Sequence, residues 1–590
     1  MKRYIYSTLA LFAAASATYA VDFTTSSGSG NVLFTPAENT DYDIYYNGPK
    51  ADTSGDVKAR VGGTKVSQTQ YTPSSVTFKQ GDGTTTWAAN YWNLLVNWNF
   101  DTKDLAEGEK IVLKNESSTY VQLQYGEITI QNSDANSKSV AVIDAGTSYY
   151  YIRGNALDQT PDLYIKTDTK LTGTRKDYSL YLGGSSTLQV SNNATLSLEG
   201  NVIANGDTSR NAVVKIDAGS AIKLVNGKTL TFNKTSALEN NGAIIGSGTL
   251  TISNGNTFDM AGEINLTSYI NPTTGKSIKS KLVIDSGTKL SALNNNLYAD
   301  DISIDGTGTE LTINDANRSN GATYLTNGAV FNVLGMLTSG QGQLISIKSG
   351  SQMIVNKTNA GVRSLNNLVI DGANSLLHIK GDVNSNRHAT ITNNGVLKIE
   401  GQYKLSNNSN QTDFTNASRT ELTIATGGKV IADSLLIATA RLNLQTENAI
   451  TNANGEAIDL TVDSATKLSI LMMSASQKFN TITANKQNLQ VEILDDAILS
   501  ASFVSENGGK IFINGFTEET IFVENADQIS DANSIFFAYA TADDAETEID
   551  KLYINNGWLS AIAPVIPEPA EWAMIFGGIA LGLAIYRRRK

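Results

Sequence analysis

Cysteine is absent from the 590 residues of this chain, and only two histidines and eight prolines occur. The absence of cysteine excludes a disulfide scaffold, thiol catalysis and metal sites built on cysteine. Two histidines, His378 and His388, are too few for a zinc site, which needs three or four His or Cys ligands. The fold must therefore be stabilised by backbone hydrogen bonds and apolar packing.

Charged residues are also scarce. They make up 17% of the chain, against roughly 25% in an ordinary globular protein. Hydrophobic residues make up 41% and there are 49 glycines, a composition typical of many short strands separated by polar turns and too apolar for a disordered chain. Residues 21–566 carry 39 basic and 55 acidic side chains, a net charge of −16. Nucleic acid and anionic lipid are therefore not expected as partners.

The N-terminus has the three parts of a secretory signal peptide. Lys2 and Arg3 precede a mostly apolar run over 5–17, and Ala20 ends a small-x-small triplet, with an alternative triplet that ends at Ala17. We expect a signal peptide that is removed after Ala20 and that directs export by the Sec machinery. The alternative is a buried N-terminal helix, which the basic flank and the short apolar run disfavour.

The C-terminus consists of three consecutive segments, which are Pro567-Glu568-Pro569, an apolar segment over 572–586, and Arg587-Arg588-Arg589-Lys590. The apolar segment would form a helix about 22 Å long, which is shorter than the roughly 30 Å hydrocarbon core of a bilayer. The basic cluster would stay on the cytoplasmic side and leave residues 21–566 outside. These features predict one C-terminal hydrophobic helix that holds the chain in the inner membrane only transiently.

This order of segments, over 567–590, resembles the PEP-CTERM sorting signal of Gram-negative bacteria. In that family an exosortase, a membrane transpeptidase-like enzyme, recognises and removes the tail. The resemblance implies that the exosortase is a processing partner and that the mature protein is on the cell surface or extracellular. An ordinary tail anchor is the alternative. The resemblance says nothing about what the body of the chain does.

One short phrase recurs in the body. It is an alternating apolar run followed by Asp or a substitute, then Gly, then Ser or Thr, at 142–147, 215–220, 283–288, 303–306, 347–351, 369–372 and 423–427. A second phrase is Asn-Gly followed by a further apolar run, at 226–227, 241–242, 327–328 and 394–395. Both phrases supply turns that need a positive φ or a side-chain hydrogen bond.

The spacing of isoleucines gives the period of the repeat. Ile284 and Ile304 stand 20 positions apart, Ile347 and Ile370 stand 23 apart, and Ile370 and Ile391 stand 21 apart. A unit of this length is too short to fold alone and must bury its apolar side against its neighbours, as a solenoid coil does. Alternation within each run points every second side chain inward.

These patterns predict an all-β chain that forms a right-handed parallel β-helix (solenoid) with N- and C-terminal capping regions and ladders of Asn, Ser and Thr at the turns. This repetition of short apolar runs and polar turns is similar to that in pectin-lyase-like proteins and autotransporter passengers. A string of β-sandwich domains is the second possibility, since it also has strands every 8–12 residues. The expected organisation is a signal peptide at 1–20, a cap at 21–110, the repetitive β-helix at 111–431, further coils and a cap at 432–566, and the sorting tail at 567–590.

Aromatic residues gather in the expected N-terminal cap, at Trp87, Trp92 and Trp98. They could form a carbohydrate-stacking platform, but a solenoid needs an atypical end and alternate rings of a strand normally point into a core. Covering the first coil is therefore the favoured role.

The sequence contains only weak indications of a nucleotide-binding or catalytic site. The triplets Gly227-Lys228-Thr229 and Gly275-Lys276-Ser277 lack the earlier glycine of a phosphate loop, since Ile222 and Ile270 stand there. His378 has no nucleophile elbow near it in sequence and is expected on the outer side of a strand. Both histidines are expected to lack partners.

Carboxylates recur with the turns rather than in one local group, and the acidic segments at 41–43 and 543–548 lack the glycine of a calcium loop. We predict no catalytic, cofactor or metal site. The expected function is that of an exported structural or adhesive surface protein, with extracellular polysaccharide as a candidate partner. The alternative is a secreted β-helical polysaccharide lyase or glycoside hydrolase, which would require clustered acids in an exposed groove.

Overall fold

The computed structural model describes part of the chain. The described residues are 19–23, 41–46, 60–61, 75–80, 91–95, 98–101, 112–115, 120–133, 140–154, 160–207, 209–293, 297–356, 365, 367–385, 387–406, 420–463, 469–486, 489–539, 548–564, 579–581, 583 and 587–588. They divide into two compact units, Met1–Gly335 and Met336–Lys590.

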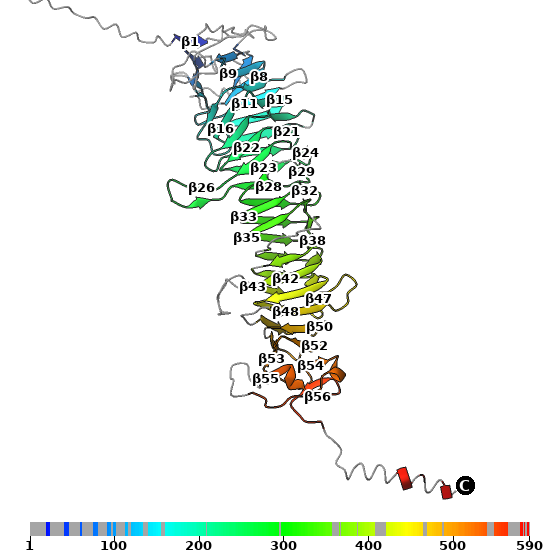
Figure 1. Ribbon diagram of the computed structural model, residues 1–590. Coiled ribbons are helices and arrows are strands. Elements are labelled where there is room, and N and C mark those ends of the chain that lie inside the picture. The colour runs from blue at the N-terminus through cyan, green and yellow to red at the C-terminus, as the bar shows by residue number, and fades with distance from the viewer. Residues whose placement is uncertain are drawn as a thin grey trace, which may run out of the picture. The chain divides into compact units, whose positions relative to one another are not determined.

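Unit 1 is a parallel β-solenoid in which each turn contributes one strand to each of several sheets (Figure 1). The first sheet contains β1 (Tyr19–Phe23), β2 (Asp41–Tyr46), β4 (Ser75–Gln80), β7 (Val112–Asn115), β10 (Ala141–Asp144), β13 (Thr169–Thr172), β16 (Thr195–Glu199), β19 (Ala221–Leu224), β22 (Ala243–Gly246), β25 (Glu263–Leu266) and β30 (Leu297–Tyr298).

The second sheet of unit 1 contains β3 (Arg60–Val61), β5 (Tyr91–Leu95), β8 (Tyr120–Tyr125), β11 (Tyr150–Gly154), β14 (Leu180–Gly184), β17 (Val202–Asn205), β20 (Thr229–Asn233), β23 (Thr249–Ser253), β28 (Lys281–Ile284), β31 (Asp301–Asp305) and β33 (Ala316–Thr326). The third contains β6 (Trp98–Asp101), β9 (Glu127–Gln131), β12 (Asp162–Ile165), β15 (Ser186–Val190), β18 (Ala212–Ile216) and β21 (Ser236–Asn240). A fourth contains β24 (Thr257–Asp259), β29 (Lys289–Ala292), β32 (Glu310–Ile313) and β34 (Val330–Val333). A small hairpin, β26 (Tyr269–Ile270) and β27 (Ser277–Ile278), projects from the side of the coil (Figure 1).

Unit 2 is also a parallel β-solenoid, with three series of strands. One contains β35 (Leu337–Lys348), β37 (Leu368–Asp371), β40 (Ala389–Thr392), β43 (Thr420–Ile424), β46 (Ala440–Leu444), β49 (Ser469–Met473), β51 (Leu489–Ile493), β53 (Ile511–Asn514) and β55 (Phe536–Tyr539). Another contains β36 (Gln352–Val355), β38 (Leu376–Lys380), β41 (Val396–Glu400), β44 (Lys429–Ile431) and β47 (Ile450–Thr451).

The remaining series of unit 2 contains β39 (Val383–Ser385), β42 (Gln402–Ser406), β45 (Ser434–Ala438), β48 (Asp459–Asp463), β50 (Gln477–Asn485), β52 (Leu499–Glu506) and β54 (Ile521–Val523), followed by the antiparallel β56 (Tyr553–Asn555) and β57 (Trp558–Ser560). Two single-turn 3₁₀ helices, η1 (Ala526–Gln528) and η2 (Ala532–Ser534), precede β55.

The register confirms the predicted period. Ile284 pairs with Ile304 in unit 1, and Ile370 pairs with both Ile347 and Ile391 in unit 2. All five side chains are fully buried, so equivalent isoleucines of successive turns stack in the interior. Their neighbours along each strand face outward, as the alternating burial of β28 and β37 shows. The solenoid interior is therefore made by the alternation that the sequence displays.

Parallel pairing shows that the β-sandwich alternative is wrong. Among the described strands, antiparallel pairs are confined to the β26–β27 hairpin and to the end of unit 2, where β57 pairs with β54 and β56. β-Sandwiches are antiparallel, whereas every other strand pair described here is parallel and joins one turn to the next.

The turns largely follow the predicted phrases. Asn226-Gly227 and Asn327-Gly328 have positive φ at both residues, as a type I′ turn requires. Asn241-Gly242 has a positive φ at neither residue. At 394–395 the left-handed pair is instead Asn393-Asn394. A positive φ is therefore found at three of the four Asn-Gly pairs and is absent from Asn241-Gly242. The turn at 394–395 lies one residue earlier because asparagine itself tolerates this conformation.

A ladder of buried hydroxyl groups joins successive turns, as predicted for Ser and Thr. Thr309 Oγ1 accepts a hydrogen bond of 2.9 Å from the Gly287 N–H of the preceding turn and donates one of 2.7 Å to the Asp305 carbonyl. Ser375 does the same in unit 2, where its Oγ accepts from Gly350 N–H at 3.0 Å and donates to the Asp371 carbonyl at 2.8 Å. Each hydroxyl replaces backbone pairing where the chain leaves a strand.

In the part of the chain that the structure describes, no helix is long and apolar enough to cross a membrane. The described positions of the predicted C-terminal helix, which include Ile579, Leu581 and Leu583, are helical and exposed.

Candidate functional site

The residues of the predicted processing signals lie at the ends of the chain. Ala20 is in β1, which pairs in parallel with β2. Arg587 and Arg588 are helical and exposed. Pro567, Glu568, Pro569 and Arg589 lie outside the described residues, as does most of the predicted signal peptide.

The recurring aspartates hold the turns together. Asp305 Oδ1 accepts hydrogen bonds from the side chains of Thr326 and Asn327 in the next turn. Asp371 Oδ1 accepts one of 2.7 Å from Asn393 Nδ2. Asp144 Oδ1 accepts from Gly146 N–H and, one turn on, from the Thr172 hydroxyl. These carboxylates therefore make the turn contacts that their regular recurrence indicates.

The two histidines have acidic partners, so the expectation that both lack one is wrong. His378 Nε2 lies 2.7 Å from Glu400 Oε1, and His388 Nδ1 lies 3.9 Å from Glu421 Oε2. In each case the glutamate comes from the next turn, and the separation along the chain hides that proximity in the sequence. The outward position predicted for His378 in β38 is confirmed.

The two Gly-Lys triplets are turns, as the sequence indicated. Gly227 is in the left-handed turn after β19, and Gly275 is in the tip of the β26–β27 hairpin. Within the described residues no three His, Asp or Glu side chains come close enough together to hold a metal ion. The acidic segment at 543–548 lies outside those residues, apart from Glu548.

Of the aromatic residues predicted to cap the N-terminal end, Trp92 is in β5 and Trp98 is in β6, while Trp87 lies outside the described residues. Phe100, also in β6, is fully buried.

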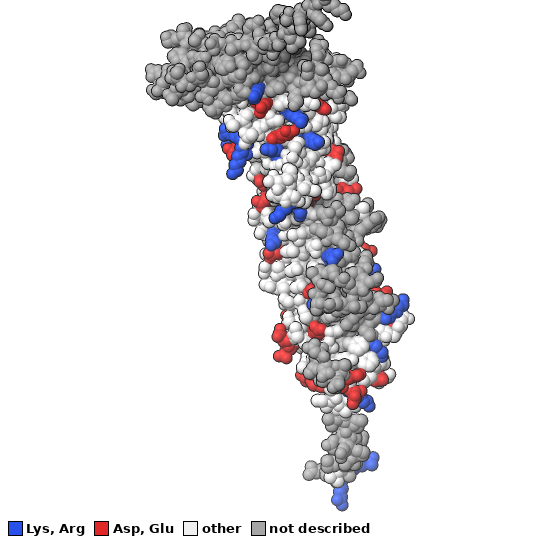
Figure 2. Space-filling view, turned by 90° about the vertical axis from the view of Figure 1, so that its left-hand side faces the viewer, with Lys and Arg blue, Asp and Glu red and all other residues white. Residues whose placement is uncertain are grey.

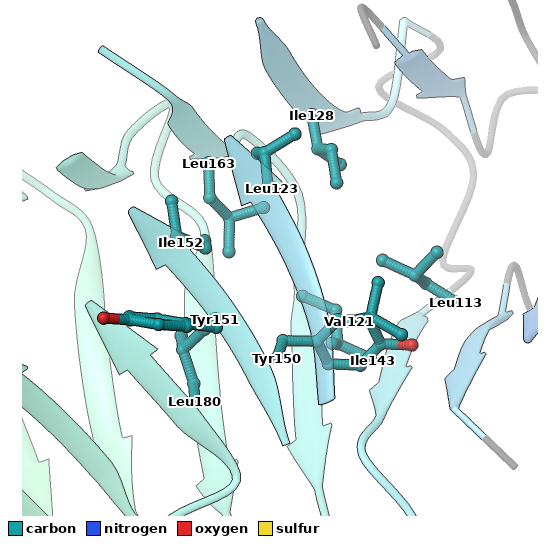
Figure 3. A pocket seen from close by; sticks show the side chains of 10 residues that line it. All are labelled: Leu113, Val121, Leu123, Ile128, Ile143, Tyr150, Tyr151, Ile152, Leu163 and Leu180. Carbon is teal, nitrogen blue, oxygen red and sulfur yellow. The ribbon is translucent and has the colours of Figure 1, made fainter. Parts of the chain in front are cut away.

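A small apolar cavity lies inside unit 1 between the turns around β8 and β11. Figure 3 shows the side chains that line it, which are Leu113, Val121, Leu123, Ile128, Ile143, Tyr150, Tyr151, Ile152, Leu163 and Leu180. The Tyr150 hydroxyl is buried there and has no hydrogen-bond partner among the described residues. Burial, reinforced by the nearby Asp144, raises the pKa of Tyr150 well above its usual value. The cavity is a gap in the core rather than an open site.

Tyr151, the next residue of β11, points away from Tyr150 and belongs to a cluster on the outer side of unit 1 (Figure 3). We call this the tyrosine cluster, and it consists of Tyr120, Tyr149, Tyr151, Tyr178 and Tyr181, with Arg175. These tyrosines come from three successive turns, at β8, β11 and β14 and the segments that precede β11 and β14. All five are half-buried.

The rings of the tyrosine cluster pack against one another along the direction in which the turns stack. Ring centroids are 5.0 Å apart for Tyr120 and Tyr149, 4.8 Å for Tyr149 and Tyr178, and 4.9 Å for Tyr151 and Tyr181. The last two pairs are edge-to-face, with interplanar angles of 86° and 88°. This geometry is the favoured one for aromatic pairs and fixes the rings relative to each other.

Two arginine side chains, Arg175 and Arg153, contact rings of the tyrosine cluster. The Arg175 guanidinium carbon lies 4.7 Å from the ring centroids of both Tyr149 and Tyr178. Arg153 Nη1 donates a 2.9 Å hydrogen bond to the Tyr151 hydroxyl. Cation–π contacts of this kind favour a fixed ring orientation. Burial by these neighbours is the main reason that the pKa values of Tyr149 and Tyr151 lie above the usual tyrosine value.

Gly183 makes room for two of the rings. A Cβ at this position would lie 2.9 Å from a ring carbon of Tyr151 and 3.0 Å from one of Tyr181. The two rings therefore lie directly over the backbone of β14. A side chain at position 183 would have to displace both rings, so the close packing of these rings on β14 requires glycine there.

The tyrosine cluster stands at one end of an uncharged column. Along the second sheet of unit 1, eight outward residues are in register from turn to turn, namely Tyr151, Tyr181, Ile203, Thr231, Thr251, Val283, Ser303 and Tyr324. By contrast, the corresponding column of the first sheet includes Lys170 and Lys223. On the face drawn in Figure 2, uncharged areas lie between scattered acidic and basic side chains.

Sequence reasoning missed this cluster. The run Tyr149-Tyr150-Tyr151 and the pair Tyr178 and Tyr181 were visible, but nothing in the sequence alone shows that Tyr151 and Tyr181 are paired. Tyrosines at equivalent positions of adjacent turns would have indicated the cluster. These positions can be recognised only once the number of residues in the turn between Tyr151 and Tyr181 is known.

The fold and this surface define the class of protein, an all-β parallel solenoid that carries a tyrosine cluster and a single column of uncharged outward residues on one sheet of unit 1. No protein-family model, no curated protein and no solved structure matches the chain.

Proposed function

We propose that this chain is an exported bacterial surface or matrix protein whose solenoid body serves in structure or adhesion. The observation that carries the proposal is the uncharged outer column of the second sheet in unit 1, with the tyrosine cluster at its end. Exposed apolar and aromatic surface on a soluble protein marks an interaction site. A parallel solenoid, in which each turn is hydrogen-bonded to the next, is a rigid way to present such a strip.

Targeting is the second part of the proposal. In it, residues 1–20 are a signal peptide, and residues 567–590 are a PEP-CTERM tail that an exosortase removes after a transient stay in the inner membrane. Support comes from the order of the Pro-Glu-Pro triplet, the apolar segment and the basic cluster. We further infer a right-handed winding of the solenoid, because parallel strand crossovers are almost always right-handed.

Mass spectrometry of both termini tests the targeting proposal, with the chain expressed in a Gram-negative host that has an exosortase. We expect the mature protein to begin at Val21 and to lack the residues after about Pro569. Glu568→Ala should leave the full-length chain in the inner membrane, whereas Glu571→Ala, which changes an acid just outside the triplet, should be processed normally. Retention of Arg587, Arg588 and Arg589 on most molecules would contradict the proposal.

Polysaccharide cleavage is the alternative function, and it predicts reducing or unsaturated sugars on incubation with a substrate. The turn aspartates favour the structural function, because Asp305 and Asp371 are already hydrogen-bonded to neighbouring turns. We expect the mature chain to release no sugars from pectin, alginate or glycosaminoglycans. Turnover that a single Asp→Asn change abolishes would establish the enzyme instead.

A further inference from the structure

We infer that the tyrosine cluster of unit 1 is a binding site for an uncharged polysaccharide. The inference extends the proposed surface function. It rests on that function in one respect, which is that export brings the protein into contact with a polysaccharide outside the cell. Its test uses purified protein and is independent of export. The five tyrosines are on the outer side of the solenoid, where their half-exposed rings offer apolar faces and hydroxyl groups together.

The first argument is periodicity. Tyr151 and Tyr181 occupy equivalent positions of adjacent turns, and Tyr120 and Tyr149, one residue before the paired Val121 and Tyr150, form a second such pair with a ring separation of 5.0 Å. Strands one turn apart are about 4.8 Å apart, which is comparable with the length of one sugar ring in an extended polysaccharide. Tyrosines that recur from one turn to the next suit a repeating polymer, whose successive units can each meet an aromatic ring.

The second argument is rigidity. Arg175 between two rings, the edge-to-face contacts and the close approach of Gly183 fix the rings before any ligand arrives. Asn205 Nδ2 also donates a hydrogen bond to the Tyr181 hydroxyl. A ligand therefore loses little affinity to the ordering of side chains. Tyrosine is suited to this use because its ring is apolar and its hydroxyl is polar.

The third argument concerns charge. The basic side chains around the cluster are already engaged, since Arg175 Nη2 lies 3.7 Å from Asp177 Oδ2, Arg153 donates to Tyr151, and Arg210 forms an ion pair with Asp207. Two of the three guanidinium charges are thereby balanced by carboxylates, and the net charge of −16 over residues 21–566 repels an acidic polymer. The uncharged column that continues from Tyr181 through Ile203 and Thr231 extends the same chemistry. An uncharged polysaccharide fits this surface better than an acidic one.

A protein partner is the competing occupant, because tyrosine and arginine are enriched at protein interfaces. The two in-register tyrosine pairs, which together extend over three turns, favour a periodic ligand, whereas a folded protein surface has no such period. The two occupants are distinguished by the experiment below.

The experiment is native affinity electrophoresis of the intact chain in gels that contain one soluble polysaccharide each. The uncharged probes are mixed-linkage β-glucan, xyloglucan and galactomannan, and the acidic probes are alginate and polygalacturonate. We expect retardation by at least one uncharged probe that persists at about 1 M salt, where electrostatic attraction is screened. Tyr181→Ala and Tyr178→Ala should each weaken binding about tenfold.

Matched variants separate a binding role from a structural one. Tyr181→Phe keeps the ring and should retain most of the binding. Tyr164→Ala removes an outward, half-buried tyrosine of β12 on the third sheet, outside the cluster, and should bind like the unaltered chain. Gly183→Ala should weaken binding by displacing the Tyr151 and Tyr181 rings. Hydrogen exchange should show that each variant keeps the solenoid.

Several results would overturn the inference. One is the absence of retardation by every uncharged probe, which would leave a protein as the occupant. Another is binding to the acidic probes alone that disappears at high salt. The inference also fails if Tyr178→Ala and Tyr181→Ala bind normally, if Tyr181→Phe is as weak as Tyr181→Ala, or if Tyr164→Ala is equally impaired. Each result can occur whether or not the tail is processed, so the two proposals fail independently.

Discussion

Thr309→Val tests whether the hydroxyl ladder holds the turns of unit 1 together. Valine has the shape of threonine but removes the hydroxyl that accepts from Gly287 N–H at 2.9 Å and donates to the Asp305 carbonyl at 2.7 Å. Thr309 is fully buried, so water cannot replace its hydroxyl in place. Each hydrogen bond contributes about 0.5–1.5 kcal/mol net, which gives a local loss of about 1–3 kcal/mol.

The assay for Thr309→Val is hydrogen–deuterium exchange resolved to single amides by fragmentation mass spectrometry. Opening of the Gly287 amide should become easier by about 1–3 kcal/mol, and its exchange should accelerate by about 5- to 150-fold. Thr309→Ser keeps the hydroxyl and should preserve most of the protection. Thr312→Val, an outward position of β32, is the control for the substitution itself. Unchanged exchange at Gly287 in Thr309→Val would refute the reasoning.

Three further predictions concern burial and charge. Ile284→Asp should destabilise unit 1 by more than about 3 kcal/mol in urea unfolding, because Ile284 is fully buried, and the outward Val283→Asp should cost far less; equal effects would contradict the assigned interior. Tyr150→Phe removes a buried hydroxyl without a described partner and should stabilise the chain by about 1 kcal/mol, whereas a clear loss of stability would reveal an unseen partner. Lys478 lies 2.8 Å from Glu524 and is the main reason that the pKa of Glu524 lies below its usual value. The stabilisation of the fold by this ion pair is complete at neutral pH and is lost as the pH falls through the lowered pKa of Glu524. Glu524→Gln should therefore reduce the loss of folding stability below about pH 4. A stability-versus-pH profile that is unchanged in this variant would contradict the prediction.

The interior of the solenoid was predictable because it repeats a chemical pattern. Ile284, Ile304 and Ile370 stand in the same phrase, and their spacing indicated the turn length that the register confirms. The phrase also placed the left-handed residues at Gly287 and Gly372. Apolar alternation and turn chemistry are local properties, so a single sequence contains them.

The outer surface was much less predictable, because it depends on which residues are one turn apart. The turn that joins Tyr151 to Tyr181 is longer than the turn that joins Tyr181 to Ile203. Insertions between strands change the number of residues that separate equivalent positions of successive turns, but they leave the buried side chains in register. The tyrosine cluster was missed for this reason. The His378–Glu400 contact was missed because the residue in register with His378 is Lys398, and Glu400 approaches the imidazole from two positions further along β41.

Surface exposure of the solenoid is the central claim, and antibody labelling of intact cells tests it most directly. The antibody should recognise the β26–β27 hairpin, because Ile270 at its edge is 71% exposed and the loop projects from unit 1 (Figure 1). The account predicts that unpermeabilised cells are labelled and that brief external protease treatment removes the label. Labelling that appears only after the cells have been permeabilised would contradict it.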